Sequence, residues 1–259
     1  MKSYLFKIVM LIAVAFGIFA PKMFAQNSES ADNLHQTFDG LLQKYVHGNR
    51  FDYDGIFNNK KDLQQLFNYV NLLEKQNPAS WEKNDALAFW INLYNAATLE
   101  LVLQNYPLKS IKDIGGLFSS PWKREVVTVA GRKLTLDAIE NDVIRKEFGD
   151  ARIHFAVNCA SIGCPPLANF AYSGKLLDAQ LNENTQRALN DPNWVEITED
   201  KILVTKIFDW YKGDFETDAG SVRKFIAKFR PADQQKIFDD SRKIETMDYN
   251  WNLNQFEKN

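Results

Sequence analysis

The stretch "ALAFWINLYNAATLELVL", residues 86–103, most constrains how this chain can fold. Drawn as a helix, it is apolar almost all the way round, so it has no solvent-facing side. The rest of a fold normally wraps such a helix on several sides. We therefore predict a long central helix from about residue 80 to residue 106, where Pro107 ends it.

Two amides interrupt this apolar stretch. Asn92 and Asn95 are three residues apart, on one edge of the same helical face. A buried amide without partners costs on the order of 1–3 kcal/mol, so both should be hydrogen-bonded. Either they pin a loop against the helix or one of them lines a polar pocket, and Asn92 is kept as a candidate site residue for the second case.

The remaining pattern predicts an α+β fold. Apolar spacing predicts helices over 32–47 and 59–76 before the central helix. After it come a hairpin around Ala130-Gly131, a helix capped by Thr135 and ended by Gly149, a helix from Ser173, a second hairpin around Glu199-Asp200, and short helices near 219–229 and 231–240. Helices come first and strands later, which favours a helix-rich N-terminal part whose central helix packs on a mostly antiparallel sheet.

The first residues, "MKSYLFKIVMLIAVAFGIFAPKMFAQ", have the pattern of a secretory signal peptide: a charged start, a short apolar run and small residues. We expect cleavage after Ala25, with an uncleaved N-terminal anchor as the alternative. The mature chain, residues 26–259, then reads as one domain without a second membrane segment, in the periplasm or outside the cell. The whole chain has a net charge of −2 and no basic tract, so we expect no nucleic-acid partner.

The segment "ARIHFAVNCASIGCPPLANF", residues 151–170, holds both cysteines and one of the three histidines. If residues 152–159 form a strand, His154 and Asn158 point to one face and Cys159 to the apolar one. The following residues read as a turn, and Cys164 then lies in a loop before two prolines.

Several interpretations of the two thiols are open. Cys159 and Cys164 could form a disulfide in an oxidising compartment, or both could be inert. Alternatively, His154 lowers the pKa of Cys164 and makes it a thiolate nucleophile. A zinc site is the remaining interpretation, but the spacing matches no zinc finger.

A carboxylate can complete a Cys–His pair by orienting the imidazole. Asp209 and Asp214 lie among aromatic residues in "FDWYKGDF", just after a predicted strand. We select Asp209 for this role, the alternative being that it caps a short helix. Motifs of serine hydrolases, nucleotide-binding loops and zinc proteases are absent from the sequence, and we predict neither a cofactor nor a metal.

Four segments together resemble a known family: "LAFWINLYNAATLELVL", "LTLDAIENDVIR", "RIHFAVNCASIGCPPL" and "IFDWYKGDF", with "YNWNLN" compatible. This is the family catalogued as domain of unknown function 547, and the resemblance covers about residues 80–215. The family occurs in exported bacterial proteins and has no assigned activity. The resemblance carries over His154, Cys159, Cys164 and Pro165.

A central helix followed by a histidine-bearing sheet is also similar to papain-like and transglutaminase-like enzymes. Their nucleophilic cysteine starts the central helix, whereas this helix contains Asn92 and no cysteine. Our hypothesis is an exported thiol-dependent hydrolase or acyl transferase that acts on an amide or ester of a small molecule, peptide or envelope component. Cys164 is its nucleophile, His154 its base, and Asp209 or Asn92 the orienting residue. The rival is a non-catalytic binding or structural domain of the envelope with both cysteines bridged or buried.

Overall fold

The structure is a computed structural model that describes residues 33–115 and 120–257. The predicted signal peptide, residues 1–25, lies outside the described residues. Its cleavage therefore stays a prediction.

The N-terminal half is built around helices, as the apolar spacing predicts. Its elements are α2 (Gln36–Tyr45), β1 (Val46–His47), β2 (Arg50–Phe51), α3 (Tyr53–Asn58), α4 (Lys60–Glu74), η1 (Pro78–Ser80), α5 (Lys83–Gln104), η2 (Ile111–Asp113), η3 (Pro121–Lys123), β3 (Glu125–Val129), β4 (Arg132–Thr135) and η4 (Ala138–Phe148). The helix η4 is a wide, π-type helix; it begins where Thr135 Oγ1 accepts the Ala138 N–H and ends at Gly149, which has a φ of 64°. Both predicted ends of this helix are confirmed.

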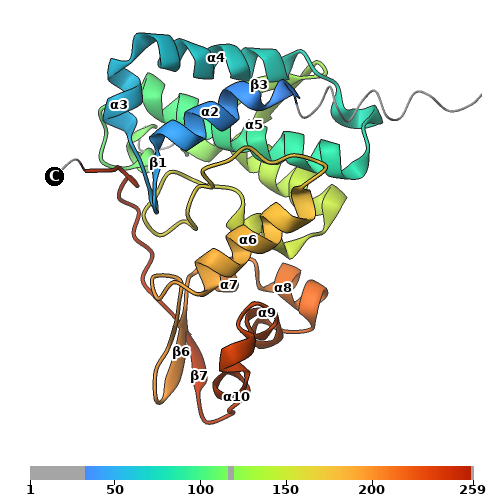
Figure 1. The fold of residues 1–259 in the computed structure, drawn as a ribbon, viewed down its shortest axis with the longest axis vertical. Coiled ribbons are helices and arrows are strands. Elements are labelled where there is room, and N and C mark those ends of the chain that lie inside the picture. Colours follow the sequence, from blue (N-terminus) through green and yellow to red (C-terminus); the bar gives the residue numbers. More distant parts are fainter. Residues whose placement is uncertain (1–32, 116–119, 258–259) are drawn as a thin grey trace, which may run out of the picture.

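The C-terminal half mixes short helices with strands. Its elements are η5 (Ala151–Phe155), α6 (Leu177–Leu189), β5 (Val195–Ile197), β6 (Lys201–Val204), α7 (Ile207–Trp210), α8 (Lys212–Ala219), α9 (Val222–Phe229), η6 (Pro231–Asp233), α10 (Gln234–Ile237) and β7 (Lys243–Thr246). Figure 1 shows α4 and α5 at one end of the molecule, α6 across the middle, and α8 to α10 with β6 and β7 at the other end.

The helix α5 is the central helix that its apolar sequence predicts. Nearly every residue from Asp85 to Leu103 is buried, including Asn92 and Asn95, and the helix packs against α4, η4 and β3. Among the described residues it is the one helix long and apolar enough to cross a membrane, yet 94% of its most apolar window is buried inside the protein. Its apolar surface is therefore covered by the fold itself.

The α+β prediction is confirmed, with strands in three small sheets. The pairs β1–β2, β3–β4 and β5–β6 are antiparallel, and β7 joins β6 in parallel. The β3–β4 hairpin turns at Ala130 and Gly131, whose φ angles of 49° and 77° suit the right-handed twist of a tight hairpin. Of these sheets, β3–β4 packs on α5, while β5–β6–β7 belongs to a second core in the C-terminal half.

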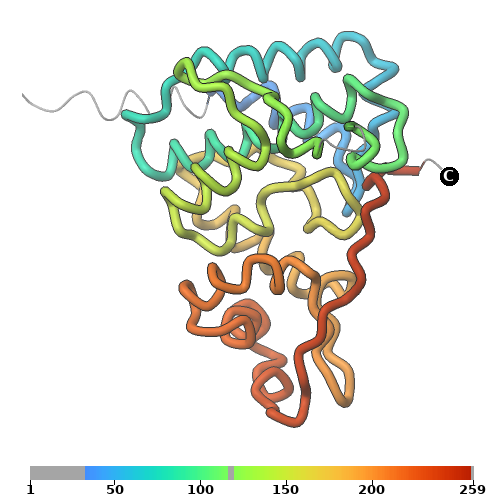
Figure 2. Tube along the Cα trace, turned by 180° about the vertical axis from the view of Figure 1, so that it is seen from behind, coloured from blue at the N-terminus to red at the C-terminus, as the bar shows by residue number. Residues whose placement is uncertain are grey.

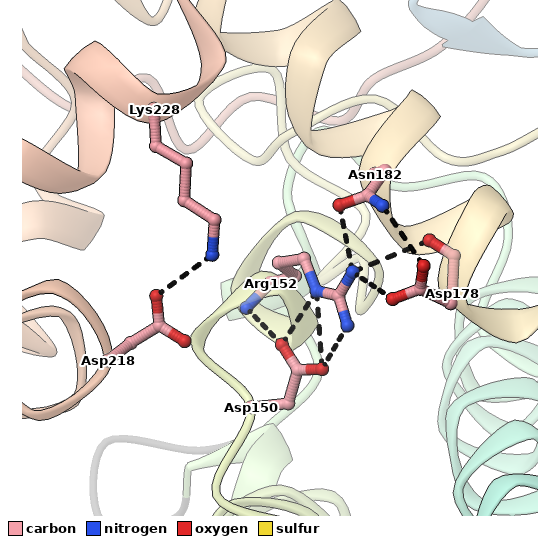
Figure 3. A network of polar contacts seen from close by, with 6 residues as sticks. All are labelled: Asp150, Arg152, Asp178, Asn182, Asp218 and Lys228. Carbon is pink, nitrogen blue, oxygen red and sulfur yellow. Dashed lines mark hydrogen bonds and ion pairs between the residues drawn. The ribbon is translucent and has the colours of Figure 1, made fainter.

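The predicted strand over residues 152–159 is wrong. Residues Ala151–Phe155 form the short 3₁₀ helix η5, because the Asp150 side chain accepts the Arg152 N–H at 2.9 Å and starts a turn. Figure 3 shows the Arg152 guanidinium held by Asp150 and, on α6, by Asp178 and Asn182. This network fixes η5 against α6, and it replaces the alternation of faces expected for a strand.

The C-terminal tail runs back from β7 along one side of the molecule to the N-terminal half (Figures 1 and 2). On its way it pairs with the loop after η5: Ile162 N donates to Asn252 O and Gly163 N to Asn250 O, both at 2.8 Å. The tail then pairs with Phe51 in β2. The cysteine-bearing loop is thus held between the two halves and the tail.

Candidate functional site

An open cavity of about 330 Å³ lies where the two halves and the tail meet. Its wall includes both cysteines and His154 from the segment after η4. The other wall residues come from α5, η3, the start of η4, α7 with the residue after it, and the tail. The cavity therefore collects side chains that are far apart in the sequence around one pair of thiols.

The Cys159 thiol has three polar neighbours. Ser161 Oγ and Tyr249 Oη each lie 3.2 Å from its sulfur, and Cys164 Sγ lies 3.1 Å from its backbone N. The neighbouring Cys164 contributes most and the two hydroxyls add to it, and together they outweigh burial and lower the pKa of Cys159 to about 7. Cys159 is thus the thiol of the pair that ionises near neutral pH.

Cys164 has the opposite electrostatic environment. Its side chain is buried, its sulfur accepts the Cys159 N–H at 3.1 Å, and its thiol faces Val157 O at 3.7 Å. Burial, followed by the neighbouring Cys159, raises the pKa of Cys164 well above its ordinary value. The prediction of Cys164 as the nucleophile depends on its exposure in a loop. In the structure the chain leading to Pro165 and Pro166 instead buries its side chain.

Both cysteines are free thiols in the structure. The backbone between them is constrained: Ala160 has a φ of 61°, in the left-handed region that a residue with a Cβ rarely adopts. Asn158 holds this turn, since its Oδ1 accepts the Ala160 N–H at 2.9 Å and its Nδ2 donates to Pro165 O at 2.8 Å. A strained residue directly after a low-pKa thiol is typical of functional sites.

His154 is paired with Asp214, not with Asp209. Its Nε2 lies 2.7 Å from Asp214 Oδ2, and Arg145 holds the same carboxylate with Nε at 2.7 Å and Nη2 at 3.0 Å. The hydrogen bond from His154, followed by that from Arg145, keeps the pKa of Asp214 well below its ordinary value. A neutral imidazole that donates through Nε2 must leave Nδ1 as an acceptor. That buried Nδ1 has no hydrogen-bond partner in the part of the chain that the structure describes.

Residues 78–188 match the family model described as a protein of unknown function, DUF547. The chain carries a DUF547 domain. No curated protein and no solved structure matches the chain.

The matched range of the DUF547 domain contains His154, Cys159 and Cys164. Asp214 and Tyr249 lie beyond it, although both contact these residues directly. Parts of the chain outside the matched range therefore contribute directly to the polar environment of the site.

Two of the residues selected from the sequence lie elsewhere. Asp209 is exposed on α7, and the chain starts a new helix, α8, before it reaches Asp214. Asn92 is fully buried and uses both ends of its amide on the backbone of Tyr172, at 2.8 and 2.9 Å. The structure therefore supports the interpretation of Asn92 as a residue that pins a loop, and it brings neither residue to His154.

Asn95 likewise holds the backbone of the residues just before Cys159. Its Nδ2 donates to Ala156 O at 2.9 Å and its Oδ1 accepts the Asn158 N–H at 2.8 Å. The two amides of the central helix thus position the backbone just before Cys159 and at Tyr172, and neither belongs to the described wall of the cavity.

Sequence reasoning missed several residues of the wall. Tyr211 stacks on His154 with ring centroids 4.0 Å apart, and its hydroxyl donates to Glu140 Oε1 at 2.6 Å. Burial and this carboxylate raise the pKa of Tyr211 well above its ordinary value. Tyr211 lies in the quoted "FDWYKGDF" segment, so that motif contained a usable signal. Tyr249, in contrast, gave none, because only the return of the tail brings it to Cys159.

Metal chemistry has no obvious site here. Within residues 33–115 and 120–257, no group of three or more His, Cys, Asp or Glu side chains is arranged to hold a metal ion. The two thiols and His154 are instead engaged with hydroxyl groups, backbone and a carboxylate.

Proposed function

We propose that this protein is a thiol-dependent hydrolase or acyl transferase that acts on an amide or ester, with Cys159 as its nucleophile. The observation that carries the proposal is a thiol with a pKa of about 7 in the wall of an open cavity, which the imidazole of a His–Asp pair also lines. A thiolate present at neutral pH is the reactive form of cysteine.

The hydroxyl groups of Ser161 and Tyr249 support the role of Cys159. Each can donate to the sulfur, which stabilises the thiolate without a positively charged neighbour. No hydrogen bond joins His154 to Cys159 among the described residues, so in our proposal the two side chains come within hydrogen-bond reach only in the substrate complex. Catalytic contacts of this kind are often long before substrate binds.

His154 supplies the proton transfers in this proposal, and Asp214 is a positioning residue. The Cys159 thiol gives its proton to His154 Nδ1, and the sulfur attacks the carbonyl carbon of the substrate. The C–N or C–O bond breaks, and the leaving group takes the proton from His154. Water or an acceptor alcohol or amine then attacks the thioester, its proton passes to His154, and the thiol is regenerated.

The direct test is acyl transfer to Cys159 from an activated ester. The folded protein is mixed with p-nitrophenyl acetate, nitrophenolate release is followed over time, and the acetylated peptide is identified by mass spectrometry. We expect one acetyl group on Cys159. The variant His154→Ala should hydrolyse the acetyl-enzyme more slowly by about 10²-fold or more, because the attack of water on the thioester loses its general base.

Matched variants separate catalysis from simple thiol reactivity. Cys164→Ala should still be acetylated, Cys159→Ala should not, and His47→Ala, which removes an exposed histidine of the β1–β2 hairpin, should behave as the parent protein. The proposal would be contradicted if acetylation persisted in Cys159→Ala. It would also be contradicted if the acetyl-enzyme were hydrolysed at the same rate with and without His154.

A further inference from the structure

The cavity beside Cys159 has walls of an unusual composition. Six aromatic side chains line it, from four separate segments: Tyr94, Trp122, Trp210, Tyr211, Tyr249 and Trp251. The tryptophans and Tyr249 contact one another, with Trp210 and Trp251 stacked at 5.9 Å and Trp122 edge-on to Trp251 at 5.5 Å. The wall is therefore built largely from aromatic rings, whose faces carry negative partial charge.

Two carboxylates complete this wall. Asp137 and Glu140 start the helix η4, and Glu140 is buried to all but 8% of its surface. Glu140 accepts a hydrogen bond from Tyr211 Oη, and Asp137 accepts one from Asn141. Neither forms an ion pair with any residue that the structure describes.

The positive charges near these carboxylates have other partners. Arg145 directs its Nε and Nη2 to Asp214 and its Nη1 to Asn141, and no lysine or arginine belongs to the described wall of the cavity. His154 shares the wall and is hydrogen-bonded to Asp214. A buried carboxylate that lacks a cation is costly, so a cationic group entering the cavity would gain the attraction of both Glu140 and Asp137.

The aromatic residues already take part in interactions with cations. Lys112 Nζ lies 3.7 Å from the ring centroid of Trp251, and Lys112 is not part of the cavity wall. Arg145 lies 4.7 Å from the ring centroid of Tyr211. Aromatic rings combined with carboxylates are how proteins recognise alkylammonium groups, which gain from the ring quadrupoles and from the opposite charge.

We infer that this cavity binds an alkylammonium group, carried by the substrate whose acyl carbon reaches Cys159. This inference rests on the proposed function in one respect: the bound ligand is a substrate only if Cys159 is the nucleophile. The binding of an alkylammonium group does not itself require catalysis. Anionic ligands are disfavoured by Asp137 and Glu140. A neutral ligand of equal shape would make the apolar contacts but would lose the attraction to the carboxylates and the rings.

The test is calorimetric titration of the full chain with three probes at constant ionic strength. The first is choline, a quaternary ammonium, the second is ethanolamine, a primary ammonium, and the third is 3,3-dimethylbutan-1-ol, which has the shape of choline without its charge. We expect one or both cations to bind at least about tenfold more tightly than the neutral alcohol. Tighter binding of choline than of ethanolamine would indicate that the natural ammonium group is methylated.

Substitutions link the binding to the cavity. Glu140→Gln keeps an oxygen for Tyr211 Oη and should weaken cation binding about tenfold without affecting the neutral alcohol. Glu125→Gln, on the exposed face of β3, is the matched control and should leave binding unchanged. Calorimetry of the parent protein measures choline binding without any acyl transfer, which separates this inference from the acylation test.

Two results would overturn the inference. One is that the neutral alcohol binds as tightly as both cations, in which case the cavity is merely apolar. The other is that neither cation binds while a neutral sugar such as N-acetylglucosamine does, in which case the aromatic wall is a saccharide site. Both comparisons use the unmodified protein, so they hold even if a variant fails to fold.

Discussion

The hydroxyl of Tyr249 is the contact through which the C-terminal tail controls Cys159, and Tyr249→Phe removes it with little change in shape. The hydroxyl lies 3.2 Å from the Cys159 sulfur and 2.9 Å from Ser161 Oγ, and the ring packs against Trp210 and Trp251. Phenylalanine keeps these ring contacts. The substitution therefore isolates one donor to the thiolate.

The expected effect of Tyr249→Phe can be derived from the pKa of Cys159. A decrease from 9.0 to about 7 corresponds to about 3 kcal/mol of preferential stabilisation of the thiolate. Cys164, Ser161 and Tyr249 provide this stabilisation against an opposing cost of burial. Cys164 contributes most and Tyr249 least of the three. A single hydrogen bond contributes about 1 kcal/mol, so loss of Tyr249 Oη should raise the pKa of Cys159 by roughly 0.7.

The assay is the rate of alkylation by iodoacetamide between pH 5 and pH 10, with the labelled cysteine identified by mass spectrometry. In the parent protein, Cys159 should label with a midpoint near pH 7, and Cys164 should label only after unfolding. Tyr249→Phe should label about fivefold more slowly at pH 6, because the rate follows the thiolate fraction.

The control is Tyr45→Phe, which removes a hydroxyl bonded to Asp62 in another part of the fold and should leave the midpoint unchanged. An unchanged midpoint in Tyr249→Phe would refute the assigned role of the tail. A parent midpoint near that of a free thiol would refute the low pKa of Cys159 itself, and labelling that requires reductant would restore the disulfide interpretation.

Further outcomes are expected elsewhere in the chain. Asn95→Ala leaves two buried backbone groups without partners and should lower the free energy of unfolding by about 2–4 kcal/mol in a denaturant titration. Gly163→Ala places a Cβ 3.0 Å from the ring of Tyr249, so it should displace the tail and slow labelling of the nearby thiol at pH 6. Asp214→Asn should lower the melting temperature at pH 7 but by less and less below about pH 4. The reason is that a carboxylate with a depressed pKa stabilises the fold above its unfolded-state pKa and loses this effect as the pH falls through its folded-state pKa. N-terminal sequencing of exported protein should begin near Gln26, and an intact first methionine in the cytosol would contradict the predicted signal peptide.

Much of the fold could be predicted because its signals are local. The apolar stretch around Trp90 identified α5, since a helix without a polar side has to be buried. Gly131 identified a tight hairpin turn and Gly149 a helix end, because glycine adopts a positive φ at no steric cost. The expected strand around His154 failed, because alternating polarity over so few residues cannot reveal the turn that Asp150 starts.

The sequence by itself determined that His154 and the two cysteines lie close together along the chain, and that Asn92 and Asn95, once buried, must be hydrogen-bonded. It also narrowed the acidic partner of His154 to the segment that contains Asp209 and Asp214. Only the tertiary structure distinguished the environments of the two thiols, because Cys164 is buried whereas Cys159 contacts the hydroxyl groups of Ser161 and Tyr249. The hydroxyl of Tyr249 reaches Cys159 across 90 residues of chain. Such a contact is set by the packing of the tail between the two halves, and no local pattern in the sequence encodes it.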